Sequence, residues 1–590
     1  MSGHLLALTV GPVQEFIAAA RRTRDLWFGS YLLSEISKAT AKAVQDHGGK
    51  LIFPAPPSDA ELAPDSTLNV ANVIVAELSE SDPTVVAHAA KEAARSRWRS
   101  FAEAVFRDHQ SVIQADIWND QVDDVIEFYS AWRIYSSQTY QADRAALMRL
   151  LSARKRCRDF LPAKGRAGVP KSSLDGLRES VLRPPGDWPE RSRRRLRLQP
   201  GEQLDVVGMV KRTWTSAGSA PRYPSVARVA ADSWLRGIDV SRLDALVNAC
   251  RSLGSEILHE IDTSEDRGHP PYAAFPFEGT AVFRARHRDM LEEAELSDTH
   301  LQPLARALAE LTRDFGEPNS YLGVLVADGD RMGQALSGLE SADDHRAFSQ
   351  ALASFASETR QIVQGHNGVL VYAGGDDVLA FVPVDRCLPC SRALHDKFGD
   401  TLAQWSTKTK TQLTLSVGLA IAHFMEPLED LLEYGRAAER HAKRPRSEDR
   451  AQLERDGLAV HVLKRGGGPV AVRANWSTQP EKQLQQLAEW IESRAISGRV
   501  AYDLQKVADV YESWPASTVK DAIQRDALSV MRGKQPRGAS RMSELEGFIK
   551  ARVVGADSLR GLANDLLVAR QVAAALGQAS SDSPVREDSL

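Results

Sequence analysis

Cysteine is scarce in this sequence of 590 residues, which contains only four, and only Cys387 and Cys390 lie close together. A scaffold held by disulfides needs more cysteines at short spacings, so this class is excluded. No apolar run approaches the roughly 20 residues of a membrane-spanning helix. The first ten residues also lack a basic segment followed by a long apolar core. We therefore expect a cytoplasmic protein with no membrane contact.

A strong net charge is also missing. The chain has 74 Lys and Arg against 78 Asp and Glu, a formal net charge of −4. No global positive field favours nucleic acid, so any such contact must be local. Hydrophobic residues make up 43% and charged residues 26% of the sequence, as in ordinary globular proteins. The length is too great for one core and predicts about four domains.

The most informative stretch has two apolar runs around Gly374-Gly375-Asp376-Asp377. This pattern predicts a tight β-hairpin, and the glycines allow the positive φ angles that such a tip requires. Two adjacent carboxylates at the tip repel each other, and a hard divalent cation such as Mg²⁺, which prefers oxygen ligands, would remove the repulsion. For these four residues alone, a solvated turn is an equally good explanation.

More acids follow a second apolar run. Residues 321–327 predict a buried strand, and Asp328-Gly329-Asp330 comes directly after it. The end of a buried strand is where such sheets bind ligands, although the three residues could also form a simple capping turn. In a β-α-β-β order this strand and the hairpin are neighbours, so Asp328 and Asp376 can converge. Two carboxylates and nucleotide phosphates would complete a Mg²⁺ shell.

Two further polar residues suit the same place. Ser416 lies in the next predicted strand, and Lys443 ends the helix after it. A lysine at a helix end can neutralise a triphosphate as a point charge. Taken alone, Lys443 would be interpreted as an ordinary surface lysine.

The order β-α-β-β-α-β occurs twice, which predicts an α+β multidomain fold with two ferredoxin-like palm domains of polymerase and nucleotide-cyclase type. The middle hairpin of the first copy carries no acid pair. A Gly/Pro linker is expected at 466–469, and a helical bundle after it. The predicted domains are a first palm (1–143), an intervening mixed domain (144–315), a second palm (316–466), a C-terminal helical domain (467–579) and a disordered tail (580–590).

Two segments are basic. Residues 144–171 contain nine Lys or Arg and a single acid, and Arg191–Arg197 forms a second cluster. Either could contact a phosphate backbone, and either could be a solvated surface near a domain boundary. The sequence leaves both interpretations open.

These motifs resemble those of one family. Residues 372–380 (YAGGDDVLA) together with 328–333 (DGDRMG) are similar to the large palm-domain subunit of type III CRISPR RNA-guided effector complexes. Residues 11–17 (GPVQEFI) and 20–30 (ARRTRDLWFGS) resemble the first palm of its type III-B (Cmr) branch. The resemblance extends over nearly the whole chain.

The resemblance implies an activity. In this family two palms face each other and hold two ATP molecules, and the 3′-hydroxyl of one attacks the α-phosphate of the other. Pyrophosphate leaves, and repetition gives a 3′–5′ cyclic oligoadenylate used in antiviral defence. Such transfer depends on positioning and charge neutralisation more than on a side-chain base. The implied partners are other Cmr-type subunits, guide RNA and target RNA.

By the same resemblance, Asp328, Asp376 and Asp377 are predicted to be catalytic and to hold Mg²⁺ (or Mn²⁺). The predicted nucleotide contacts are Gly329, Asp330, Gly374, Gly375, Ser416, Lys443 and, from the first palm, Ser30.

Two departures from the family pattern are expected. The chain starts at a first palm, so we expect no HD nuclease, and the His395-Asp396 pair is predicted to lie on a helix surface. The segment resembling the first zinc-binding cysteine pair of relatives, residues 171–176, contains no cysteine. Cys387 and Cys390 have no second pair, so we expect no zinc.

Two other functions remain as alternatives. The first is a non-catalytic scaffold, against which the crowded carboxylates argue. The second is a diguanylate cyclase, but that family places Glu-Phe after Gly-Gly-Asp, where Asp377-Val378 stands here. The sequence does not decide the ring size of the product or whether an acceptor other than ATP is used.

Overall fold

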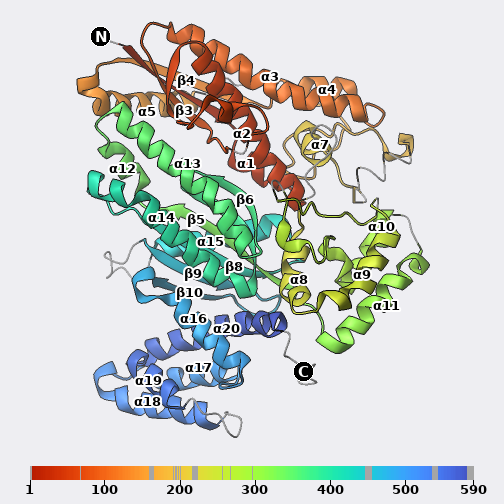
Figure 1. Cartoon of the computed structure of the whole chain (residues 1–590), viewed down its shortest axis with the longest axis vertical. Helices are drawn as coiled ribbons and strands as arrows, with labels where there is room; N and C mark the ends of the chain where they lie inside the picture. The colour runs from red at the N-terminus through yellow and green to blue at the C-terminus, as the bar shows by residue number, and fades with distance from the viewer. Residues whose placement is uncertain are drawn as a thin grey trace.

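A computed structural model of the chain shows two stacked palm domains, with a mixed domain beside them and a helical domain at the far end (Figure 1). The structure describes residues 3–66, 68–157, 165–189, 192, 196, 198–199, 201–214, 223–255, 257–265, 268–294, 297–444, 455–533 and 542–580. The arginines of the 191–197 cluster and residues 581–590 of the predicted tail lie outside these ranges.

The first palm has a four-stranded antiparallel sheet in the order β2-β3-β1-β4. Its strands are β1 (Gly3–Gly11), β2 (Gly49–Phe53), β3 (Val73–Leu78) and β4 (Glu127–Tyr135). Apolar residues at helical spacing on α2 (Thr23–Asp46) and α3 (Pro83–His109) cover one face of this sheet. Leu147 and Leu151 of α5 (Tyr140–Arg156) pack on the opposite face. The predicted β-α-β-β-α-β order is confirmed.

The second palm repeats this arrangement in a six-stranded sheet with the order β10-β9-β8-β5-β7-β6. Its strands are β5 (Tyr321–Gly329), β6 (Val369–Gly374), β7 (Asp377–Pro383), β8 (Leu415–His423), β9 (Gly457–Val462) and β10 (Val470–Asn475). The order β8-β5-β7-β6 corresponds strand by strand to β4-β1-β3-β2 of the first palm. The prediction of two palm domains is therefore confirmed.

Helices cover both faces of the second sheet. α13 (Ala342–Gly365) and α14 (Cys387–Thr409) pack on one face, and α15 (Leu428–Lys443) packs on the other. Successive residues of β5 point to opposite faces: Val324 belongs to the α15 side and Leu325 to the α14 side. The strand is thus buried on both faces, as its continuous apolar sequence predicts.

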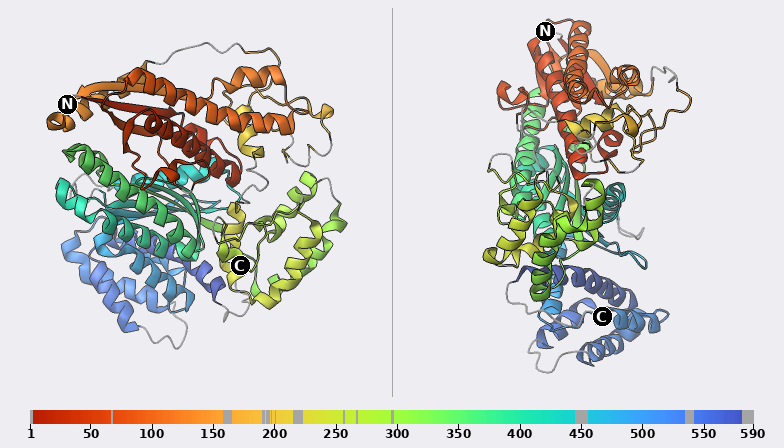
Figure 2. Two further views of the ribbon diagram at one scale, coloured as in Figure 1. Left: turned by 45° about the horizontal axis from the view of Figure 1, so that its top comes forward. Right: turned by 90° about the vertical axis from the view of Figure 1, so that its right-hand side faces the viewer.

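The two palms contact each other directly (Figure 2). The Tyr140 hydroxyl of the first palm lies 3.0 Å from Nδ1 of His345 on α13, and both side chains are buried. Arg346, on the same helix, donates from Nε to the carbonyl of Leu51, at 2.8 Å. Polar groups from both domains therefore fix how the palms sit together.

The intervening domain connects the palms through short helices. These are α7 (Val206–Thr213), α8 (Val226–Arg236), α9 (Val240–Leu253), α10 (His287–Ala294) and α11 (Asp298–Phe315). α9 ends at Leu253, because Gly254 adopts a positive φ of 80°. In the basic segment, Arg144 donates to the Leu336 carbonyl and Arg166 pairs with Glu179, so these two arginines bind protein groups.

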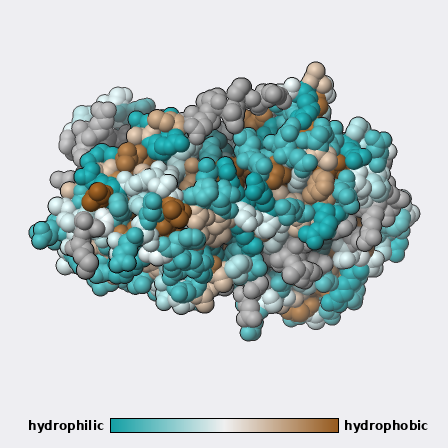
Figure 3. Space-filling view, turned by 90° about the horizontal axis from the view of Figure 1, so that it is seen from above, coloured by the Kyte–Doolittle hydropathy of each residue, from teal (hydrophilic) through white to brown (hydrophobic). Residues whose placement is uncertain are grey.

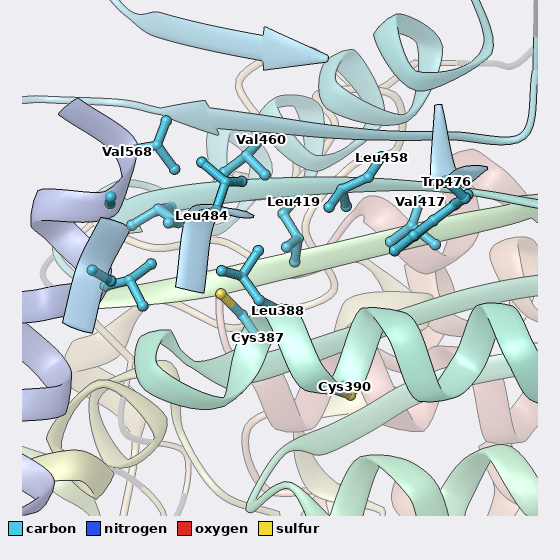
Figure 4. Packing of buried hydrophobic residues seen from close by; sticks show 14 of the residues in the cluster. Cys387, Leu388, Cys390, Val417, Leu419, Leu458, Val460, Trp476, Leu484 and Val568 are labelled. Atoms are coloured by element: carbon cyan, nitrogen blue, oxygen red, sulfur yellow. The ribbon is translucent and has the colours of Figure 1, made fainter. Parts of the chain in front are cut away.

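The C-terminal helices are α16 (Pro480–Glu492), α17 (Val500–Val510), α18 (Ala516–Gly533), α19 (Met542–Arg552) and α20 (Ala556–Ala579). They share one core with the second palm: Leu484 and Val568 pack with Leu419 and Val460 of the sheet (Figure 4). The predicted linker at 466–469 is the turn between β9 and β10, which pair antiparallel. The linker prediction was therefore wrong, since the sheet continues beyond it.

The surface is mostly hydrophilic, with small separate apolar spots when the molecule is seen from the side of the first palm (Figure 3). Among the residues that the structure describes, no helix combines the length and apolar character needed to cross a membrane.

Candidate active site at the hairpin of the second palm

Strand pairing brings the predicted acids together. β5 and β7 are antiparallel neighbours in which Ala327 pairs with Val378, so Asp328 at the end of β5 lies beside the hairpin acids Asp376 and Asp377. Asp328 also lies close enough to Asp377 to contribute to the raised pKa of that carboxyl. Three carboxylates from two adjacent strands thus gather at one edge of the sheet.

Glycines make this approach possible. A Cβ atom on Gly329 would lie 2.7 Å from Cβ of Asp376, closer than real Cβ contacts. Gly375 adopts a φ of 71°, in the left-handed region that favours glycine. A Cβ on Gly374 would collide with the ring of Tyr372. Gly329 and Gly374 therefore serve close packing within the protein, and Gly375 forms the turn.

The three acids repel one another. Burial, followed by the nearby charge of Asp328, raises the pKa of Asp376 to about 6. Burial and the charges of Asp376 and Asp328 also raise the pKa of Asp377. Raised carboxyl pKa values mean that the protein alone does not neutralise these charges.

Lys443 is a cation in direct contact with one of these acids. Its Nζ lies 2.5 Å from Oδ1 of Asp328 and 2.8 Å from Oε1 of Glu439. Although burial disfavours its charge, the neighbouring carboxylates of Asp328 and Glu439 raise the pKa of the Lys443 ammonium. The sequence reasoning missed Glu439, yet its position four residues before Lys443 on a helix is the usual spacing for an ion pair.

The donor set fits a hard cation only in part. All of the candidate metal ligands are carboxylate oxygens whose negative charges are not neutralised by the protein. Such a set suits Mg²⁺ or Mn²⁺. However, no group of three or more His, Cys, Asp or Glu side chains in the described part of the chain is arranged to enclose a metal ion. Because Lys443 occupies one oxygen of Asp328, the arrangement suits two carboxylates with phosphate oxygens as the further ligands.

Two of the predicted nucleotide contacts, Asp330 and Ser416, are buried inside the protein. Asp330 is fully buried, and the Ser416 hydroxyl donates to it at 2.8 Å. Thr414 donates to the same carboxylate, also at 2.8 Å. Both side chains are fully buried and hydrogen-bonded to each other, so in this structure neither reaches the surface.

Ser30 of the first palm is also buried, on α2. A Cβ on its neighbour Gly29 would lie 2.9 Å from Cε of Lys211, so this glycine admits a buried lysine. Trp27 stacks between Tyr31 and Tyr223, with both ring centroids 5.5 Å away. In this structure these residues of α2 pack within the protein.

The surroundings of the two cysteines and the histidine on α14 indicate structural roles. Cys387 and Cys390 point into the core on α14, and burial raises both thiol pKa values, which disfavours the thiolate that zinc requires (Figure 4). The prediction of a surface pair was wrong for His395, whose ring is largely buried against Trp476 with Nε2 2.9 Å from Oδ1 of Asp456. The side chain of Asp396 is 46% exposed, as predicted.

Comparisons with known proteins agree with this architecture. The N-terminal domain family of CRISPR-associated protein Cmr2 matches residues 5–103, and the second palm domain family of Cas10/Cmr2 matches residues 321–453. The Cmr subunit Cmr2 of a CRISPR system from Pyrococcus furiosus is 26% identical in a match that covers 45% of this chain and 32% of that protein. The match thus spans about a third of the length of this relative.

Two solved structures share the fold. One, a type III-B Cmr-beta assembly in its apo state, matches with a TM-score of 0.62 and 13% identity over 91% of this chain and 78% of that chain. The other, Cmr-beta bound to cognate target RNA, matches with a TM-score of 0.61 and 14% identity over 91% and 79%. The two family matches, in this order, and the Cmr2 relative show that the chain is similar to the large Cmr2 subunit of type III-B systems, which supports the predicted resemblance.

Proposed function

We propose that this chain is the signalling subunit of a type III-B CRISPR effector complex. On binding of target RNA, it converts ATP into 3′–5′ cyclic oligoadenylate for antiviral defence. Its partners are other Cmr-type subunits, guide RNA and target RNA. Support for these partners comes from the Cmr subunit name of the Pyrococcus relative and from the fold shared with a target-bound Cmr-beta complex.

One observation carries the proposal: Asp328, Asp376 and Asp377 meet at one sheet edge with Lys443 beside them. A site kept only for packing has no physical reason to crowd three carboxylates, since burial and the neighbouring charges raise the pKa values of Asp376 and Asp377. The corresponding turn between β2 and β3 in the first palm spans residues 54–72 and carries no pair of adjacent acids. The second palm is therefore the catalytic half.

The proposed chemistry is a nucleotidyl transfer. The 3′-hydroxyl of one ATP attacks the α-phosphorus of the second, the bond to the bridging oxygen breaks, and pyrophosphate leaves. Asp328 with Asp376 or Asp377 would hold Mg²⁺, which neutralises phosphate charge when bound. Lys443 lies close enough to exchange its contact with Asp328 for one with a phosphate oxygen. The side chains bind and orient the reactants.

The test uses the assembled complex with guide RNA, target RNA, ATP and Mg²⁺, with products identified by mass spectrometry. Wild type is expected to release pyrophosphate and cyclic oligoadenylate. Replacing both hairpin acids, Asp376→Ala with Asp377→Ala, is expected to abolish product while target RNA still binds.

The matched control replaces another pair of adjacent acids, Asp123→Ala with Asp124→Ala, which lie exposed on the first palm. This variant removes the same charge and should retain full activity. Equal product from the hairpin variant would overturn the proposal. Absence of product from wild type with several divalent ions would favour the scaffold function.

A further inference from the structure

The acid two residues after Asp328 occupies an unusual position. Asp330 has no exposed surface, yet its carboxylate accepts hydrogen bonds from both the Thr414 and Ser416 hydroxyls. The backbone N–H of Asp456 donates to Oδ2 of the same carboxylate at 2.9 Å. The guanidinium of Arg455 lies 3.6 Å from Oδ1. A buried charge with this many partners fixes the segments that carry them.

Those segments reach both members of the Asp328–Lys443 ion pair. Asp330 follows Asp328 on the same turn, in which Arg331 has a φ of 59°. On the other side, the N–H of Arg455 donates to the carbonyl of Lys443 at 2.9 Å. Asp330 therefore connects the end of β5, which carries Asp328, with the helix that ends in Lys443.

The backbone around Arg455 and Asp456 is held in a conformation that these residue types rarely adopt. Their φ angles are 71° and 46°, in the left-handed region. Two consecutive non-glycine residues persist there only when their surroundings fix them. The contacts with Asp330 provide that constraint from one side, and His395 provides it from another, through its 2.9 Å contact with Asp456.

A second layer supports the helix end itself. Arg473 on β10 donates from Nε to the carbonyl of Ala442 and from Nη2 to the carbonyl of Arg455, both at 3.2 Å. The helix end with Lys443 and the segment held by Asp330 are therefore fixed to each other and to the sheet.

We infer that Asp330 is a positioning residue that sets the separation of Asp328 and Lys443, with Asp456 and His395 as its supports. The inference rests on the proposed function of those two residues. Asp330 touches neither substrate nor metal. It acts by keeping the metal-binding acid and the phosphate-binding lysine at a fixed separation.

The experiment compares Asp330→Asn with Asp385→Asn in the full chain. Asp385 is a matched control, since it is also a buried carboxylate with a serine and an arginine, accepting from Ser233 at 2.6 Å and from Arg236 at 2.7 Å. Hydrogen exchange over residues 436–444, the end of α15, is measured on the chain alone. Product formation is measured in the assembled complex.

Asp330→Asn is expected to speed exchange at the end of α15 and to lower kcat about 10- to 100-fold, the usual effect of losing an outer-shell partner. The Mg²⁺ concentration for half-maximal rate should rise. Asp385→Asn should change neither exchange at this helix end nor the Mg²⁺ dependence. Equal effects of the two variants would overturn the inference.

A milder pair serves if Asp330→Asn does not fold. Thr414→Val removes the hydroxyl that donates to Asp330 with little change of shape, whereas Thr414→Ser keeps it. Faster exchange in the valine variant alone supports the inference, and identical exchange in both contradicts it. If wild type forms no product, the proposed function fails, and the exchange comparison still decides the role of Asp330.

Discussion

At the scale of single residues, Gly329 decides how closely the acids approach. It has no side chain where a Cβ would meet Asp376, Met332 and Phe398 within 3 Å. Gly329→Ala should therefore destabilise the fold by about 1–3 kcal/mol, the usual cost of overpacking. Thermal and urea unfolding measure the effect. Gly333→Ala is the control, since a Cβ there meets nothing within 4 Å; an equal loss in both variants would contradict the account.

Lys443 is the second residue whose role can be isolated. Lys443→Gln keeps most of the side-chain length but removes the charge that faces Asp328. A charge-assisted hydrogen bond is worth about 1.5–3 kcal/mol, so kcat/KM for ATP should fall about 10- to 100-fold. Lys506→Gln, a change at an exposed lysine on α17, should leave the rate unchanged. If Lys443→Gln matches wild type, the lysine does not hold phosphate.

The sequence was enough to predict that the acids at 328, 376 and 377 lie near Lys443, but not how the residues around them are buried. Acids at the ends of adjacent strands must converge once the strand order is known. The burial of Asp330 was not predictable, because it depends on Thr414, Ser416 and Asp456, which lie far away in the sequence. In a turn beyond the strand end, the alternation of inward and outward side chains no longer applies.

At the scale of elements, the contact between α5 and α13 makes the stability of the palms depend on pH. Burial, followed by the charge of Arg144, lowers the pKa of His345 from about 6.5 to about 3. Because the folded pKa lies below the unfolded one, this contribution to stability is complete above about pH 6.5. It is lost as the pH falls towards 3.

Thermal unfolding between pH 8 and 5 measures this dependence. For wild type, protonation of His345 in the unfolded chain costs up to about 2 kcal/mol at pH 5. His345→Asn should show a weaker decrease, whereas His88→Asn, at an exposed position of α3, should decrease like wild type. Identical pH profiles for wild type and His345→Asn would refute the assignment.

The β9–β10 hairpin shows where element prediction fails. Glycine and proline at 466–469 are equally typical of linkers and of turns, and only the antiparallel pairing of β9 and β10 distinguishes them. The strand pairing of β10 with β9 involves residues on both sides of the predicted domain boundary. Local sequence therefore placed the boundary inside a hairpin.

At the scale of the whole molecule, the second palm and the C-terminal helices share a single core. A chain ending at Asn475 would expose Leu419 and Val460 where Leu484 and Val568 now cover them. We expect it to lose cooperative unfolding or to aggregate, as followed by calorimetry and size-exclusion chromatography. A chain ending at residue 580 should unfold like wild type. A stable, cooperative shorter chain would show that the helices form an independent domain.

The central claim is that the acids of the second palm form one metal–nucleotide site. The most direct measurement is the binding of Mn²⁺ in the presence of a non-hydrolysable ATP analogue, followed by electron paramagnetic resonance. The account predicts that nucleotide-dependent Mn²⁺ binding is lost in Asp328→Asn and in Asp376→Asn with Asp377→Asn, and is retained in Asp123→Asn with Asp124→Asn. Undiminished binding in both site variants would contradict it.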